Sequence, residues 1–176
     1  MSAEQHPLVQ LAHQAIDAYI REGRRLSAPA APDCTAEMRE RAGAFVSLHE
    51  AGELRGCIGT FSPQHDNVAE EIIENAIASA TRDPRFYPVQ PGELPNLEIS
   101  VDILEEPEEV ASLTELDPET YGVIVKAEHD NRRGLLLPAL EQVKTAEQQV
   151  SIARQKAYIG PREPVRLYRF RVRRYH

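Results

Sequence analysis

The run Leu54-Arg55-Gly56-Cys57-Ile58-Gly59 holds the residue types best suited to chemistry in this chain. It places a thiol between two glycines, with a guanidinium two positions earlier. In a β-strand alternate side chains share a face, so we expect Arg55 and Cys57 to point the same way. A nearby guanidinium favours the nucleophilic thiolate, and Gly56 and Gly59 leave room for a ligand or another chain segment to approach the sulfur. Cys57 and Arg55 are therefore our catalytic candidates. The alternative for Cys57 is an inert packing role, and for Arg55 a structural pair with a carboxylate.

Other polar residues are candidates for ligand binding. Asp83 and Arg85 flank a proline, where they either face a ligand or cap and brace a turn. Glu98 lies in an apolar stretch, where it acts as a general base, pairs with the arginine of the run, or is simply solvated. Lys156 either binds an anion or complements a helix dipole. His49 is a candidate acid/base partner of the thiol, with a solvated loop histidine as the alternative.

Composition limits the partners and cofactors that the chain is expected to use. With 176 residues and a net charge of −8, it is not expected to bind nucleic acid through a general basic surface. A set of arginines gathers near the C-terminus, and we expect the acidic region 105–119 to neutralise it; an RNA or an acidic partner is the alternative. The set comprises Arg162, Arg166, Arg169, Arg171, Arg173 and Arg174.

Several features favour a cytoplasmic protein without a resident cofactor. No apolar stretch reaches the ~20 residues of a membrane span, and residues 1–7 lack a signal-peptide pattern. The two cysteines, Cys34 and Cys57, are expected to be reduced thiols, with Cys34 a bystander at the end of a proline-rich loop. Neither metal-ligand spacing, a phosphate-binding glycine loop nor the cysteines for an iron–sulfur cluster are present, so we expect no metal and no cofactor.

Hydrophobic periodicity predicts the elements that position these residues. We expect helices over residues 7–22, ended by Gly23, over 66–81 with Asp66 as N-cap, and from Pro138 to 155. Expected strands are 44–48 and 54–59 as one hairpin, 97–104, 122–125 and 134–137 as a second hairpin, and 165–172. Region 105–120 reads as an exposed connection. The order predicts an α+β fold, one domain over 1–176, with flanking helices and a mixed, largely antiparallel sheet.

The sequence resembles a known family. The run 54–59, followed by Thr60-Phe61, is similar to the signature of the AMMECR domain family, whose prokaryotic members are called AmmeMemoRadiSam system protein A. Supporting matches cover nearly the whole chain in the family's order: residues 78–86, 97–101, 134–138 and Lys156-Ala157. The chain departs from many relatives in lacking tryptophan, notably over 143–146, and in having Arg154 where a cysteine is common, which weakens any mechanism that needs two thiols.

The resemblance implies a fold with a larger and a smaller lobe and a groove between them. The family has no established activity, but its label implies a modification pathway shared with a radical-SAM protein and a Memo-type protein. Two classes of function stay open. In the first class, the chain is an enzyme or a catalytic subunit of that pathway and uses Cys57 with Arg55. In the second class, it is a non-catalytic module that presents the groove to a small molecule or a partner protein.

Overall fold

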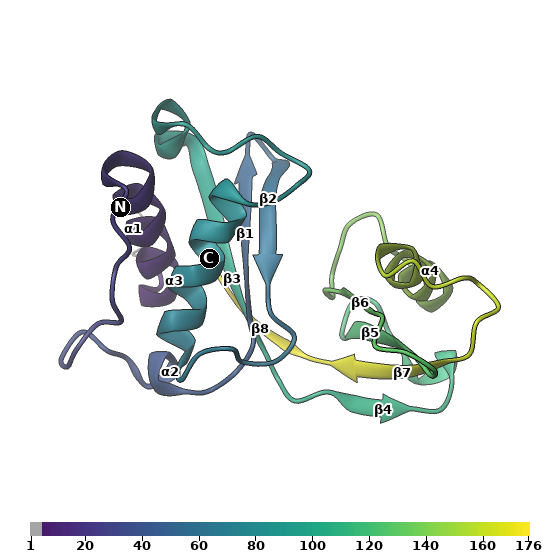
Figure 1. The fold of residues 1–176 in the computed structure, drawn as a ribbon. Coiled ribbons are helices and arrows are strands. Elements are labelled where there is room, and N and C mark those ends of the chain that lie inside the picture. Colours follow the sequence, from purple (N-terminus) through teal and green to yellow (C-terminus); the bar gives the residue numbers. More distant parts are fainter. Residues whose placement is uncertain (1–4) are drawn as a thin grey trace. The chain divides into compact units, whose positions relative to one another are not determined.

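The computed structural model describes residues 5–176, and it combines helices with antiparallel sheets, which confirms the α+β class (Figure 1). The chain forms two compact units. The first contains the described residues up to Leu104 together with Arg173–His176, and the second is Glu105–Val172. Within residues 5–176 no helix is long and apolar enough to cross a bilayer.

The first unit is a sheet with helices packed on one face. Strands β1 (Ala44–Glu50), β2 (Glu53–Gly59), β3 (Leu97–Leu104) and β8 (Val172–Tyr175) follow the order β2-β1-β3-β8, so β2 forms an edge. Helices α1 (Pro7–Glu22) and α3 (Val68–Thr81) cover it, and α2 (Ala36–Arg39) and the 3₁₀ turn η1 (Pro91–Asn96) complete the unit. Fully buried apolar residues of α1, α3 and β1 form the core, among them Leu8, Ile16, Ile72, Val46 and Leu48.

Local sequence signals set the ends of these elements. The β1–β2 turn places Ala51 and Gly52 at φ +52° and +81°, the two positive values that a tight two-residue hairpin turn needs. Gly23 ends α1 in the left-handed conformation, as predicted. The expected N-cap of α3 is wrong by one residue: Asn67, not Asp66, accepts the hydrogen bond from the backbone N–H of Glu70 at 2.9 Å.

The second unit is a smaller sheet that packs against one helix. Strands β4 (Glu108–Val110), β5 (Gly122–Ala127), β6 (Arg133–Leu136) and β7 (Val165–Phe170) follow the order β4-β7-β5-β6. Helix α4 (Ala146–Lys156) packs on β5 and β6, and the 3₁₀ turn η2 (Leu113–Glu115) lies in the segment between β4 and β5. The predicted hairpin of β5 and β6 is confirmed.

Three predictions fail in this part of the chain. Region 105–120 is not only a connection, because it contains β4 and η2. Helix α4 begins at Ala146 rather than Pro138, because Thr145 and Gln148 form a capping box. The Thr145 hydroxyl accepts from the Gln148 N–H, and the Gln148 side chain accepts from the Thr145 N–H. The single strand expected over 165–172 ends at Phe170, and its continuation, β8, pairs in the sheet of the first unit.

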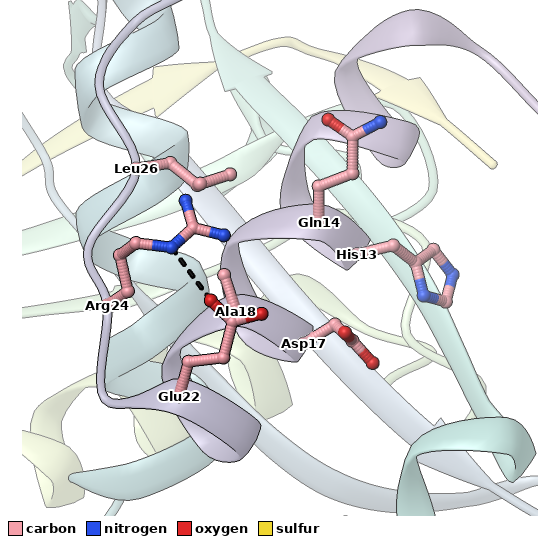
Figure 2. A pocket seen from close by; sticks show the side chains of 7 residues that line it. All are labelled: His13, Gln14, Asp17, Ala18, Glu22, Arg24 and Leu26. Atoms are coloured by element: carbon pink, nitrogen blue, oxygen red, sulfur yellow. Dashed lines mark hydrogen bonds and ion pairs between the residues drawn. The ribbon is translucent and has the colours of Figure 1, made fainter.

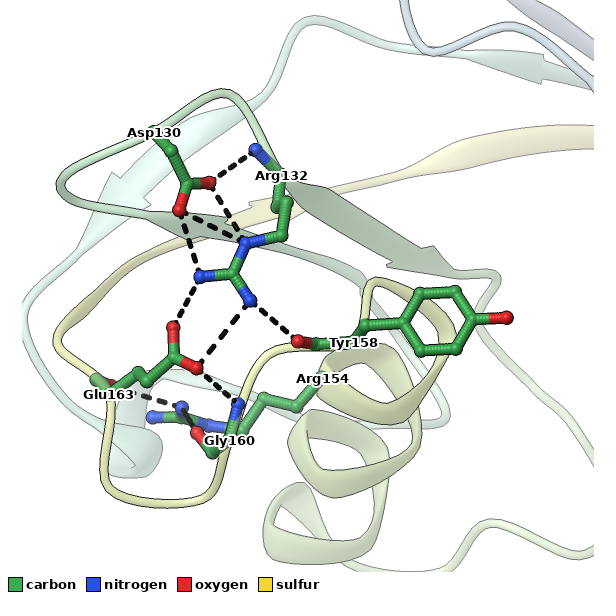
Figure 3. Close-up of polar contacts among 6 residues, drawn as sticks. All are labelled: Asp130, Arg132, Arg154, Tyr158, Gly160 and Glu163. Atoms are coloured by element: carbon green, nitrogen blue, oxygen red, sulfur yellow. Dashed lines mark hydrogen bonds and ion pairs between the residues drawn. The ribbon is translucent and has the colours of Figure 1, made fainter.

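A network around Arg132 fixes the loops of the second unit (Figure 3). The Arg132 guanidinium bonds Asp130 at 2.8 Å, Glu163 at 2.5 Å and the backbone carbonyl of Tyr158 at 2.6 Å. Arg154 donates to the Glu163 carbonyl at 3.0 Å. The network therefore ties the β5–β6 turn to the segment after α4, and Arg154 has a structural role there.

Candidate functional site

Cys57 lies on β2 opposite Ser47 of β1, and Ser47 lies opposite Ser100 of β3. Directly opposite residues point to the same side of a sheet, so these three side chains form one row. Gly56 faces the other way, because a Cβ added to it would meet the Ser79 carbonyl of α3. Cys57 is therefore on the face turned away from α3. It is partly exposed, and the hydroxyl of nearly buried Ser47 donates a hydrogen bond to its Sγ at 3.3 Å.

The turn after α3 holds the peptide groups of Cys57. The carboxylate of Asp83 accepts from the backbone N–H of Cys57 at 2.9 Å, and Arg85 donates to the Cys57 carbonyl at 3.3 Å. Asp83 and Arg85 form a two-point ion pair at 3.0 and 2.7 Å. The Asp83 side chain is 2% exposed and that of Arg85 is 53% exposed, so a buried carboxylate orients a partly solvated guanidinium beside the thiol.

The charges of this turn are reflected in its pKa values. Burial alone raises the pKa of Asp83, but the bonds from the Arg85 side chain and from the backbone N–H groups of Cys57 and Arg85 outweigh it and lower this pKa to about 2. The pKa of Arg85 is raised, chiefly by its bond to Asp83 and in part by an electrostatic interaction with Cys57. The pKa of Arg174 is raised in the same way, by its bond to Asp102 and in part by an electrostatic interaction with Cys57. Arg85 and Arg174 thus interact electrostatically with Cys57, which the sequence did not indicate.

Arg55 is positioned differently from the prediction. The strand register passes from the Leu48–Gly56 pair to the His49–Leu54 pair, so Arg55 is an extra, bulged residue and the strict alternation of faces is interrupted. Its guanidinium forms a two-point pair with Glu93 of η1 at 2.8 and 3.2 Å. This is the structural alternative for Arg55.

The other groups around Arg55 complete its environment. The Phe86 ring lies near the guanidinium carbons of both Arg55 and Arg85, at 5.9 and 5.5 Å from the ring centre. Among residues 5–176, nothing accepts a hydrogen bond from the buried Nη1 of Arg55. Glu98, the carboxylate proposed as its partner, is exposed and lies opposite His49 on β1.

The protein's own atoms fill the space beside both glycines of the signature. A Cβ at Gly56 would lie 2.3 Å from the carbonyl oxygen of Ser79, and one at Gly59 would lie 2.2 Å from the Phe45 ring. We expected both glycines to leave room for a ligand or for another chain segment. In the structure other parts of the chain occupy this room: Gly56 allows α3 to approach β2, and Gly59 accommodates the Phe45 ring.

A stripe of buried polar side chains, which the sequence analysis missed, fastens α3 to β1 and β2. They recur every four residues and so lie on one side of the helix: Glu71, Asn75, Ser79 and, just past its end, Asp83. Ser79 accepts from the Ile58 N–H at 2.8 Å and donates to the Val46 carbonyl at 2.7 Å, bridging the two strands. Their recurrence at every fourth position was the available signal. Their main partners are backbone groups, which no residue type reveals.

Lys156 lies in the second unit, on the last turn of α4. Its Nζ donates to the Leu135 carbonyl of β6 at 2.9 Å, a contact that neither alternative for this residue included. Of the predicted residues, the structure therefore brings Asp83, Arg85 and Gly56 around Cys57, with Arg55 joined to them through Phe86.

Within residues 5–176, neither a metal-ligand cluster nor the hollow beside α1 adds a candidate for catalysis. Among residues 5–176, no cluster of histidine, cysteine, aspartate and glutamate side chains could hold a metal ion. An open hollow of about 520 Å³ lies along α1 and the segment after it (Figure 2). Its lining consists of His13, Gln14, Asp17, Ala18, Glu22, Arg24 and Leu26, and contains none of the residues around Cys57.

A family model, curated proteins and a solved structure are all similar to this chain. The model of the AMMECR1 family matches residues 9–175. A protein of Thermotoga maritima is 49% identical over 176 residues, covering 97% of this chain and 98% of the relative. A Clostridium acetobutylicum protein is 48% identical over 174 residues, but the chain spans only 36% of that relative's length. The crystal structure of an uncharacterised protein from Pyrococcus horikoshii matches with a TM-score of 0.84 and 30% identity, covering 99% of this chain and 93% of that one.

Proposed function

The chain belongs to the AMMECR1 family, and on this premise we propose that Cys57 is a reactive thiol, used as a nucleophile by one component of a modification pathway. The observation that carries the proposal is the set of polar groups that converge on this one residue. Ser47 donates to its sulfur, while Asp83 and Arg85 hold its backbone N–H and carbonyl. An inert cysteine that only fills space in a core needs none of these contacts.

Each neighbour has a distinct chemical task in this proposal. Hydrogen bonding to the charged form of a group favours that form, so the Ser47 hydroxyl supports the thiolate. The guanidinium groups of Arg85 and Arg174 add positive charge. The thiol gives its proton to solvent, and the thiolate attacks an electrophilic carbon of the substrate that bears a leaving group. A sulfur–carbon bond forms as the leaving group departs with its bonding pair.

The pathway part of the proposal concerns partners. The resemblance of residues 54–59 to the family signature suggests a radical-SAM protein and a Memo-type protein as the other components. Almost two thirds of the Clostridium relative lies outside the match, so there the domain is joined to a further polypeptide. A domain that works beside another protein is consistent with that arrangement.

Alkylation kinetics test the reactivity of the thiol. The full chain is treated with iodoacetamide at pH 7, where an ordinary thiol of pKa ~8.5 is only a few per cent thiolate, and each cysteine peptide is quantified by mass spectrometry. We expect Cys57 to react faster than Cys34, which is also partly exposed and serves as the internal control. Ser47→Ala should slow Cys57 and leave Cys34 unchanged. A Cys57 that reacts no faster than Cys34 would end the nucleophile proposal.

The second candidate is a non-catalytic module that binds a small molecule or a partner. It is favoured by one observation: Glu93 already neutralises Arg55, so the guanidinium of the signature run is used structurally. Complementation of a deletion strain separates the two functions. Cys57→Ser keeps the size and the contacts of the residue but removes the thiol, so full rescue favours the binding module, and loss of function with normal folding favours the reactive thiol.

A further inference from the structure

Three cations lie side by side on the sheet of the second unit, and we call them the cationic row. Lys126 of β5 is directly opposite Arg133 of β6 on one side and Arg166 of β7 on the other. Opposite residues in antiparallel strands share a face, so the three side chains project together. All three are exposed.

This arrangement is unfavourable within the protein itself. Like charges directly opposite each other on a sheet destabilise it. Among residues 5–176, no carboxylate forms an ion pair with Lys126 or Arg166, although the chain has 28 acidic residues against 20 basic ones. By contrast, Arg169 of the same strand pairs with Glu108 at 3.1 Å, as expected for the C-terminal arginines. The predicted internal neutralisation therefore holds for Arg169 but does not extend to Arg166.

We propose that the cationic row binds an acidic polypeptide segment of a partner protein. This goes beyond the proposed function, because it concerns the second unit and does not depend on the thiol. The forked guanidinium group of Arg166 suits carboxylates, and Lys126 adds a positive charge beside it. Neighbouring strands are ~4.8 Å apart, so the row spans about 10 Å, the length of three extended residues. A short acidic stretch can thus face all three cations.

The small number of cations favours a short acidic segment over a nucleic acid or a membrane. A nucleic acid binds through many phosphate contacts, whereas the row offers three cations. An anionic membrane gains little from each basic residue near its surface, so three cations hold a protein there only weakly. The additional polypeptide of the Clostridium relative shows that a domain of this family occurs together with a second protein segment.

Binding of a defined acidic peptide tests the proposal. Fluorescein-labelled deca-glutamate is titrated with the full chain and followed by fluorescence anisotropy. We expect saturable binding that weakens as salt is raised. Lys126→Glu reverses the central charge and should weaken binding about ten-fold or more, equivalent to ~1.4 kcal/mol. Arg162→Glu, an exposed residue of the same unit outside the row, is the matched control and should stay within about two-fold.

Several outcomes would overturn the inference. It fails if the wild-type chain shows no saturable binding, or if Lys126→Glu and Arg162→Glu weaken binding equally. It also fails if a ten-nucleotide single-stranded RNA or vesicles rich in phosphatidylserine bind more tightly than deca-glutamate and depend on the same residues. Arg166→Glu provides a second variant of the row, and far-ultraviolet circular dichroism shows that each variant is folded.

Discussion

Removing the charge of Asp83 tests whether its carboxylate secures the strand that bears Cys57. The folded-state pKa of Asp83 is about 2, nearly two units below the ordinary value of 3.8. At 1.36 kcal/mol per unit, the ionised side chain contributes about 2.5 kcal/mol to the free energy of unfolding at neutral pH. Because this pKa is depressed, the contribution is complete above about pH 4 and disappears as the pH falls towards 2. Asp83→Asn should therefore cost about 2 kcal/mol at pH 7 and much less near pH 2.

Urea unfolding of the wild-type and Asp83→Asn chains, measured at a series of pH values, provides the assay. Asp17→Asn is the matched control, because Asp17 also pairs with an arginine but its side chain is 52% exposed. An exposed pair of this kind contributes about 0.5 kcal/mol or less. The reasoning is refuted if Asp83→Asn costs no more than Asp17→Asn at pH 7. It is also refuted if the difference between wild type and Asp83→Asn is the same at pH 7 and near pH 2.

Two further substitutions probe the packing and the charge of the sheets. Gly56→Ala places a Cβ 2.3 Å from the Ser79 carbonyl and should lower the free energy of unfolding by about 1–3 kcal/mol. Gly92→Ala is the control, because a Cβ there meets nothing within 4 Å and should change the free energy of unfolding little. Equal urea midpoints for the two variants would contradict this packing. Lys126→Glu removes two repulsive pairs and should raise the free energy of unfolding by about 1 kcal/mol in low salt and by less in high salt. A variant with a lower free energy of unfolding than the wild type would show that repulsion within the cationic row does not destabilise the protein.

Local signals in the sequence were sufficient to predict most of the elements. The apolar period of α1 and the following Gly23 indicated both its ends, and two strand-like runs separated by a polar segment with Gly52 indicated the first hairpin. Two of the failed predictions have different causes. Thr145 and Gln148 form a local capping box, which outweighs Pro138 as the start of α4. The strand after Val165 divides because its two ends pair in different sheets, and one segment alone cannot reveal this.

The contacts of the candidate site are mostly long-range, and this limits what its residues reveal. Arg55 and Glu93 are 38 positions apart, and Asp83 reaches Cys57 over 26. The sequence indicated that Asp83 and Arg85 form a rigid turn, and this is how they are used. It did not indicate that the turn would lie against the backbone of Cys57, because a backbone N–H has no residue type.

The bulge at Arg55 determines which side chain meets the thiol. The hairpin turn pairs Glu50 with Glu53, and in a regular ladder from that turn Ser47 would lie opposite Gly56, on the face that packs against α3. The extra residue shifts the register by one, so Ser47 lies opposite Cys57 and its hydroxyl reaches the sulfur. Arg55 thus acts on Cys57 through its place in the backbone, whatever its guanidinium does. A contact between Ser47 and Cys57 could be predicted only by knowing where the ladder is interrupted.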